Sequence, residues 1–244
     1  MNGSRWVLWL VACSHWVAAV GAVPVAQAAQ AATATPPAPR ATATAPPAPS
    51  PIEQAVALYQ QGQWAAAQAA FERLAALDVP AADYNLAVMH LKQELPQASN
   101  AQALRLLARA AERGFVTAMV SLAQLHERGD VTGKRDLAEA YRWNLRAAEA
   151  GNAEAQVEAA TAHYLGRGAP KDMAAAAHWY REAAKLGDSG AQYLIASMYE
   201  AGLGVERDLR LARYWYERCA RQGDVAAPGK LKEIDAKLAN GPAQ

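Results

Sequence analysis

Apolar and small residues recur along this chain at the spacing of amphipathic helices, and the helices come in pairs of constant length. Residues 136–152, 172–188 and 208–224 are three versions of one segment, which begins with Asp and ends in Gly followed by Asn or Asp. Each version has a Trp seven residues after the Asp, and the segments start 36 residues apart. A period of this length is typical of a solenoid, in which each unit buries its apolar face only by stacking on its neighbours.

The repeats predict an all-α fold, a right-handed α/α superhelix of stacked helix-turn-helix units. Ala is abundant among the 52% of residues that are hydrophobic, which favours helices that approach closely. Ahead of the repeats, a tetratricopeptide-like helix pair is interrupted at Gly62, and its expected packing residues are Leu58, Tyr59, Trp64, Ala65, Ala69, Phe71 and Leu74. The predicted units are a capping pair at 52–78, four repeats at 79–114, 115–151, 152–187 and 188–223, and a C-terminal capping helix and tail at 224–244.

Polar residues mark the helix ends. A carboxylate precedes each of three second helices by one residue, where an N-cap satisfies free amide donors, so we interpret Asp136, Asp172 and Asp208 as caps rather than as acid/base groups. Ser99 with Gln102, and Asp136 with Glu139, predict capping boxes. Glycine pairs between helices indicate tight turns; a phosphate loop is excluded because no strand precedes them and no Gly-Lys-Ser/Thr follows. These glycines are Gly166, Gly168, Gly202 and Gly204.

The last repeat resembles a known family. The resemblance rests on Ala191, Gln192, Tyr193, Tyr199, Gly202, Gly204, Val205, Asp208, Ala212, Trp215, Tyr216, Ala220, Gly223 and Asp224. Their pattern resembles the Sel-one-like repeat (SLR), a relative of the tetratricopeptide repeat, and it extends over about 80–223 as four units. The resemblance implies an adaptor in signalling, protein quality control, or envelope or polysaccharide assembly. Some cysteine-rich secreted members act on β-lactams, but they carry a disulfide in each repeat and this chain does not.

The N-terminal segment predicts export. Residues 1–28 combine Arg5, an apolar run and a small-x-small sequence, as in a secretory signal peptide cleaved after Ala28, or alternatively after Ala22. Lipidation at Cys13 or an uncleaved anchor are the other interpretations. Residues 29–51 are rich in Ala, Thr and Pro and predict a semi-rigid, unpacked linker. We therefore expect a periplasmic or secreted protein without a transmembrane span in the mature chain.

Charge and side-chain chemistry favour binding over catalysis. The formal net charge of +1 argues against nucleic acid as a partner. Of the two cysteines, Cys13 and Cys219, only the second remains after cleavage, so no internal disulfide is expected. No Ser/His/Asp or Cys/His set stands out, and we expect neither enzyme activity, nor a cofactor, nor a metal. His90, His126 and His163 share one repeat position; they predict packing residues, with a metal-binding or pH-sensing role as the alternative.

The first helices carry a stripe of positions that the repeat does not fix. By helical periodicity these positions lie opposite the packing positions Ala82, Leu86, Ala87 and His90. We name them the first-helix stripe: Asn85, Val88, Lys92, Ser121, Gln124, Arg128, Glu158, Thr161, Leu165, Leu194, Ser197 and Ala201. In related arrays this stripe lines the concave face, and variable residues on a repeated frame select a partner. It predicts a scaffold that binds a protein or peptide, with plain solvated surface as the other reading of the stripe.

Two further functions remain open. A β-lactam-binding protein or hydrolase requires an exposed nucleophile, for which the candidates are Ser121, Ser197 and Cys219. A polysaccharide-assembly scaffold requires exposed aromatic rings, for which the candidates are Trp64, Trp143, Trp179 and Trp215, although the recurring tryptophans are better explained as core or inter-repeat packing.

Overall fold

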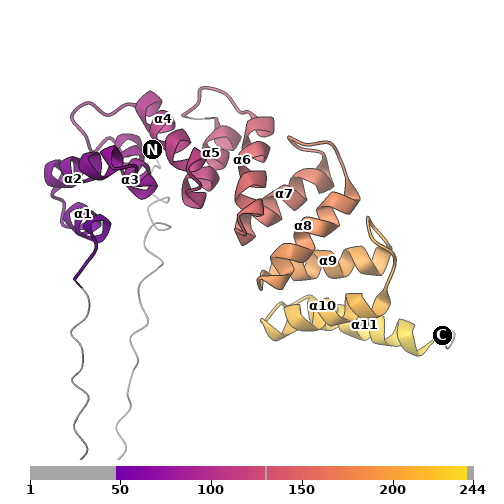
Figure 1. The fold of residues 1–244 in the computed structure, drawn as a ribbon. Coiled ribbons are helices and arrows are strands. Elements are labelled where there is room, and N and C mark those ends of the chain that lie inside the picture. The colour runs from indigo at the N-terminus through magenta and orange to yellow at the C-terminus, as the bar shows by residue number, and fades with distance from the viewer. Residues whose placement is uncertain (1–47, 130, 241–244) are drawn as a thin grey trace, which may run out of the picture. The chain divides into compact units, whose positions relative to one another are not determined.

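The structure is a computed structural model, and it describes residues 48–129 and 131–240. Everything described below belongs to the unit that begins at residue 48. The signal peptide, its cleavage sites, Cys13 and most of the predicted linker lie outside the described residues. Within the described residues there are eleven helices and no strand, which confirms the all-α fold (Figure 1).

The helices are short and similar in length. In chain order they are α1 (Pro51–Gln60), α2 (Trp64–Ala76), α3 (Pro80–Leu91), α4 (Asn100–Glu112), α5 (Val116–Arg128), α6 (Leu137–Glu149), α7 (Ala153–Leu165), α8 (Met173–Lys185), α9 (Ser189–Ala201), α10 (Leu209–Arg221) and α11 (Ala227–Ala239). Each packs mainly against the helix before it and the helix after it. Stacking of sequential neighbours is the arrangement of a solenoid. The described helices include none that is both long and apolar enough to cross a membrane.

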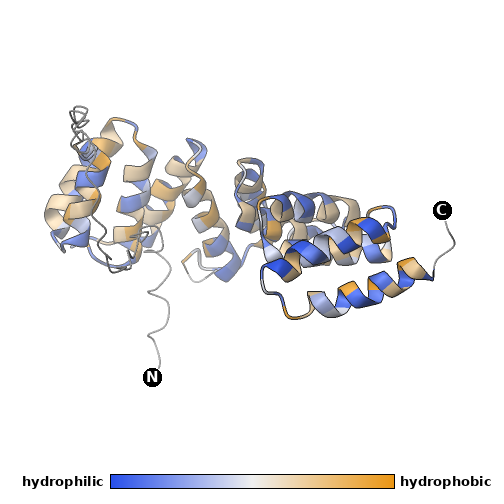
Figure 2. Ribbon diagram, turned by 90° about the horizontal axis from the view of Figure 1, so that it is seen from below, coloured by the Kyte–Doolittle hydropathy of each residue, from blue (hydrophilic) through white to orange (hydrophobic). Residues whose placement is uncertain are grey.

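Alanine makes up most of the core, as the composition predicts. Fully buried alanines lie on both helices of the repeats, for example Ala118, Ala147, Ala155 and Ala183. Figure 2 shows hydrophilic and hydrophobic residues interleaved along the helices, the pattern of elements with one buried face. Trp143 and Trp179 pack against this core and Trp215 is buried in it, which confirms the packing role of the Trp position.

The aspartate caps form as predicted. The side chains of Asp136, Asp172 and Asp208 accept backbone N–H bonds at the starts of α6, α8 and α10. The two predicted capping boxes form only in part. Ser99 and Asp136 accept the forward bond, but the side chain of Gln102 accepts from Arg105 and that of Glu139 pairs with Arg142. An arginine three residues along the helix thus engages the side chain that the reciprocal bond requires.

The second glycine of each turn is also an inter-repeat contact. Gly168 and Gly204 have φ values of +77° and +69°, which L side chains rarely adopt. A Cβ on Gly168 would lie 2.1 Å from the carbonyl oxygen of Leu137, and one on Gly204 would lie 2.0 Å from that of Met173. Leu137 and Met173 begin the second helix of the preceding repeat, so each turn rests directly on the repeat before it.

The prediction for the capping pair was partly wrong. Phe71 is fully buried and Leu74 is partly buried, but Trp64, Ala65 and Ala69 are exposed. Phe71 sets the orientation of α2, so the alanines that share its face, Ala67, Ala70 and Ala75, are the buried ones. Trp64 instead packs edge-on against Tyr59, with ring centroids 5.1 Å apart.

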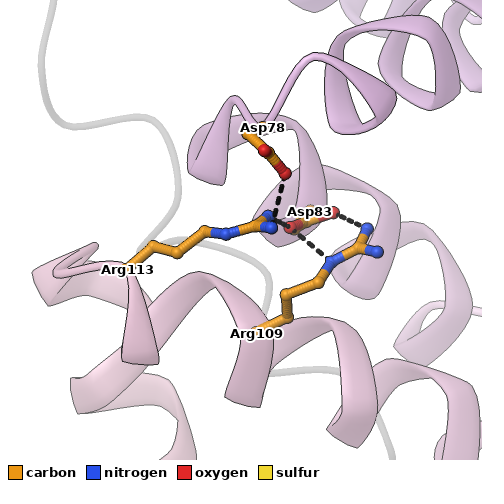
Figure 3. A network of polar contacts seen from close by, with 4 residues as sticks. All are labelled: Asp78, Asp83, Arg109 and Arg113. Carbon is orange, nitrogen blue, oxygen red and sulfur yellow. Dashed lines mark hydrogen bonds and ion pairs between the residues drawn. The ribbon is translucent and has the colours of Figure 1, made fainter.

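An ionic network joins the two helices of the first repeat (Figure 3). Asp83 on α3 is fully buried and accepts two bonds from Arg109 on α4, one of them from Nε at 2.8 Å. Arg113 contacts the same carboxylate at 3.3 Å and also Asp78 at 2.5 Å. The third and fourth repeats place Gln156 and Gln192 at the position of Asp83, where their amides donate to carbonyls of the preceding second helix at 3.2 Å. The first repeat thus has an ion pair at the position where the third and fourth repeats have a neutral hydrogen bond.

Candidate functional site

The first-helix stripe is accessible along its length. None of its twelve residues is buried, whereas three of the four predicted packing positions on α3 are, namely Ala82, Leu86 and Ala87. The fourth, His90, is partly buried, as are Asn85 and Val88 of the stripe. Two leucines of the stripe are exposed, Leu165 by 51% and Leu194 by 37%. Exposed leucines on a partly polar face are suited to contact with another protein.

The stripe borders an open cleft between α6 and α7. Helices α5, α6 and α7 and the turn after α7 all contribute to its wall. The lining residues are Glu127, Leu137, Ala140, Tyr141, Asn144, Glu158, Thr161, Ala162 and Arg167. The cleft therefore brings together two predicted stripe residues, Glu158 and Thr161, with side chains of the second helix that the sequence analysis did not single out.

The repeat itself shows why the cleft is there. Asn144 occupies the position of Tyr180 in the next repeat and Tyr216 in the last one. Both tyrosines are buried, and their hydroxyls contact Thr161 at 3.0 Å and Glu200 at 3.1 Å. Ala162 likewise stands where the last repeat has the buried Met198. Smaller side chains at two positions leave open a space that Tyr180 and Met198 fill one repeat later.

The cleft is acidic. Glu127 pairs with Arg167 at 3.6 Å, whereas no ion pair among the described residues includes Glu158. Burial of its carboxyl group raises the pKa of Glu158, although the residue as a whole is exposed, and repulsion from Glu127 and Glu154 raises it further; Arg167 opposes the shift. Glu158 is thus a carboxylate close to two others, and Arg167, which pairs with Glu127, is the cation that acts on it.

Tyr141 is fixed in the wall by a histidine. Its hydroxyl lies 2.9 Å from Nε2 of His163, and Nδ1 of His163 lies 3.2 Å from the carbonyl oxygen of Pro170. A carbonyl only accepts, so Nδ1 carries the proton in the neutral ring and Tyr141 donates to Nε2. The hydroxyl oxygen of Tyr141 keeps its capacity to accept a bond from a ligand in the cleft.

His90, His126 and His163 each accept a hydrogen bond from the residue that precedes the second helix of their repeat. The carbonyls of His126 and His163 accept from the N–H of Asp136 and Asp172 at 2.8 and 3.0 Å, which closes the loop before each second helix. In the first repeat, His90 Nδ1 accepts from the N–H of Ser99 at 3.2 Å. The backbone bonds do not depend on the side chain, since the carbonyl of Tyr199 accepts from Asp208 at 3.0 Å in the last repeat. The bond to His90 is a side-chain contact, and it agrees with a structural role. Across 48–129 and 131–240, no three His, Cys, Asp or Glu residues are arranged to hold a metal ion.

Of the candidate nucleophiles, Cys219 lacks the setting of a reactive thiol. Cys219 is buried and its thiol donates to the carbonyl oxygen of Ser189 at 3.2 Å. Burial, with the charges of Asp224 and Asp188, raises the pKa of the thiol to about 11, so it stays protonated at neutral pH. Ser121 and Ser197 lie partly buried on the stripe. Of the candidate sugar-binding tryptophans, Trp64 is exposed and the other three are partly or wholly buried.

The remaining stripe residues lie on α3, α5 and α9. Asn85 donates to the carbonyl of Ala81 at 2.7 Å, and Lys92 donates to the hydroxyl of Tyr59 at 2.8 Å. Val88 is partly buried, and Gln124 and Arg128 are exposed. Their role in binding a partner stays a prediction. The sequence did contain a signal for the cleft, since Asn144 stands at a position that holds Leu107, Tyr180 and Tyr216 in the other repeats, but its meaning depended on knowing that those three side chains are buried.

Comparison with known proteins agrees with the repeat pattern. The Sel1 repeat family matches the chain four times, at residues 80–115, 116–152, 153–188 and 189–224. Among solved structures, the chain is similar to a protective antigen of uropathogenic Escherichia coli with an SLR fold, at 27% identity and a TM-score of 0.67. It is also similar to a Sel1 repeat protein from Oxalobacter formigenes, at 32% identity and a TM-score of 0.61.

These similarities cover more of this chain than of its relatives. They include 80% and 69% of this chain but 42% and 49% of the E. coli and O. formigenes chains, so this chain spans less than half the length of either. No curated protein matches the chain.

Proposed function

The chain belongs to the Sel1 repeat family, and on that premise we propose that it is an exported scaffold that binds a protein or peptide partner in the bacterial cell envelope through its first-helix stripe. Sel1 repeat proteins are helical repeat scaffolds and often protein-interaction modules. A scaffold requires an accessible surface that differs from one repeat to the next while the frame stays constant.

The observation that carries the proposal is the contrast between frame and stripe. At the packing positions the repeats keep small buried residues such as Ala118, Ala155 and Ala191. At one stripe position they carry Asn85, Ser121, Glu158 and Leu194 in turn, none of them buried. Stability alone does not call for exposed leucines at this surface. Variation at an accessible position of a repeated frame supports recognition of a specific partner.

The exported location is part of the proposal and rests on the sequence. With cleavage of the signal-peptide pattern of residues 1–28 after Ala28, the Ala/Thr/Pro-rich linker would form the N-terminal end of the mature chain, ahead of the repeats. Lipidation at Cys13 or an uncleaved anchor would keep the same repeats at a membrane surface. In each case the partner is an envelope component.

Affinity capture from the cell-envelope fraction tests this function. We expect the wild-type protein to retain a discrete partner and a variant carrying Gln124→Arg, Glu158→Lys and Leu194→Arg to lose it by at least about tenfold, because three contacts at the centre of an interface change together. All three residues are exposed, so the variant should fold.

A matched control separates recognition from net charge. Glu112→Lys with Glu149→Lys adds the same amount of positive charge at exposed residues near the ends of α4 and α6, away from the stripe. The control should retain the partner. Equal loss in both variants, retention in both, or a native protein confined to the cytosolic fraction would contradict the proposal.

A further inference from the structure

The cleft between α6 and α7 is a break in the packing of the repeat. The corresponding place one repeat later holds Tyr180 and Met198, which are 3% and 2% exposed, where the cleft has Asn144 and Ala162. Filling such a space with apolar atoms generally stabilises a protein. An open polar cleft at this junction therefore leaves the protein less stable than a filled one would, as is common at binding sites.

The lining favours a cation over other ligands. Two carboxylates, Glu127 and Glu158, face one guanidinium, Arg167, which pairs with Glu127. An anion would add to this excess of negative charge. An apolar side chain would desolvate the carboxylate, amide and hydroxyl groups without giving them a partner. A cation instead gains charge-assisted hydrogen bonds and relieves the repulsion.

The neutral groups of the wall complete the set of acceptors. The oxygen of Tyr141 can accept, because the hydroxyl proton is donated to His163. The side-chain oxygen of Asn144 can accept as well. The ring of Tyr141 supplies an electron-rich face that attracts a cation. These groups match the several donors of an ammonium or a guanidinium group.

We propose that the cleft binds a lysine or arginine side chain of the partner. The inference rests on the proposed protein-binding function and specifies what the partner presents at the second and third repeats. The remaining stripe residues would contact the partner on either side of this basic residue.

Titration with small probes tests the inference without knowledge of the partner. In NMR spectra of the labelled protein, Nα-acetyl-lysine N-methylamide should shift the amide signals of Asn144, Glu158 and Ala162 saturably in the millimolar range. The arginine analogue should do the same. The norleucine analogue, which keeps the length and loses the charge, should bind at least about tenfold more weakly, since it forms no charge-assisted hydrogen bond.

Two variants locate the binding. Asn144→Tyr installs the residue that the next two repeats carry, so it should fold and should lower the response to lysine by at least about tenfold. Glu158→Gln keeps the shape of the wall and should weaken lysine binding by about tenfold. Equal responses to lysine and norleucine, an undiminished response in Asn144→Tyr, or no saturable response would overturn the inference. None of these NMR results would decide whether the stripe binds a partner, because affinity capture from the envelope fraction tests that separately.

The stability of Glu158→Gln provides an internal check. The pKa of Glu158 is raised in the folded state, so the folded protein binds that proton more tightly than the unfolded chain does. The carboxylate therefore costs stability once the pH rises above its ordinary value of 4.5. The variant should unfold at a higher temperature than the wild type at pH 7, and the difference should shrink below pH 4.5. A residue whose removal stabilises the fold and weakens binding acts in recognition.

Discussion

Replacing Gly204 by alanine should lower the free energy of unfolding by about 2–5 kcal/mol. About 1–2 kcal/mol comes from holding a non-glycine residue at a positive φ, here +69°. The rest comes from the contact of the new Cβ with the backbone of Met173 and Ala174, whose carbonyl and amide atoms would lie 2.0–2.7 Å away. Backbone cannot rotate aside as a side chain does, so the turn must move away from α8. Urea denaturation followed by tryptophan fluorescence measures the loss.

Gly223→Ala is the matched control. Its φ of +90° imposes the same kind of strain, but no atom lies within 4 Å of the added Cβ. The control should lose only about 1–2 kcal/mol. In a solenoid the damage stays at the affected junction, so hydrogen exchange in Gly204→Ala should accelerate in α9, α10 and α11 and much less in α3 and α4. Equal losses in the two variants would show that the contact with α8 contributes nothing.

Asp83→Ala should cost about 2–3 kcal/mol. The substitution removes the fully buried carboxylate to which Arg109 and Arg113 bind and leaves a cavity between α3 and α4. The cost stays below that of a wholly buried pair, because the two arginine side chains are 47% and 34% exposed and can reach water. Thermal and urea unfolding measure the change.

Asp78→Asn separates burial from charge, because Asn, like Asp, tolerates the positive φ of 60° at this residue. Asp78 also binds Arg113, but its side chain is 74% exposed, and such surface pairs contribute about 0–1 kcal/mol. We expect a loss of that size or smaller. A loss as large as that of Asp83→Ala would mean that the network stabilises the first repeat through its surface rather than through the buried carboxylate.

The repeated features could be predicted because each occurs several times in one sequence. The Asp caps at 136, 172 and 208 and the Trp position at 143, 179 and 215 follow from the period and from local hydrogen-bonding rules. The features that could not be predicted are contacts between residues far apart in the sequence, which depend on how the helices pack. The contact of Gly168 with Leu137 joins two repeats, and sequence alone shows only that a turn needs a glycine.

The cleft was predicted less completely than the repeats, because it is formed by side chains from helices of two different repeats. Helical periodicity placed Glu158 and Thr161 on an accessible face, but Tyr141 and Asn144 belong to the second helix, where the repeat pattern drew attention only to the cap and the Trp position. Asn144 becomes informative only when Tyr180 and Tyr216 are seen to be buried. The error in α2 is similar, since Ala65 and Ala69 are indistinguishable by composition from the buried Ala67 and Ala70. Alanine-rich helices carry little information about which face is buried.

Site-specific photo-crosslinking in the native cells tests the central claim most directly. A photoreactive phenylalanine is placed at Gln124 or Leu194 on the stripe, and at Glu112 or Glu149 away from it, all of them exposed. The account predicts that both stripe positions crosslink to the same envelope protein and that neither control position does. Crosslinks to that protein from the control positions, or none from any position while the partner is still captured, would contradict binding through the first-helix stripe.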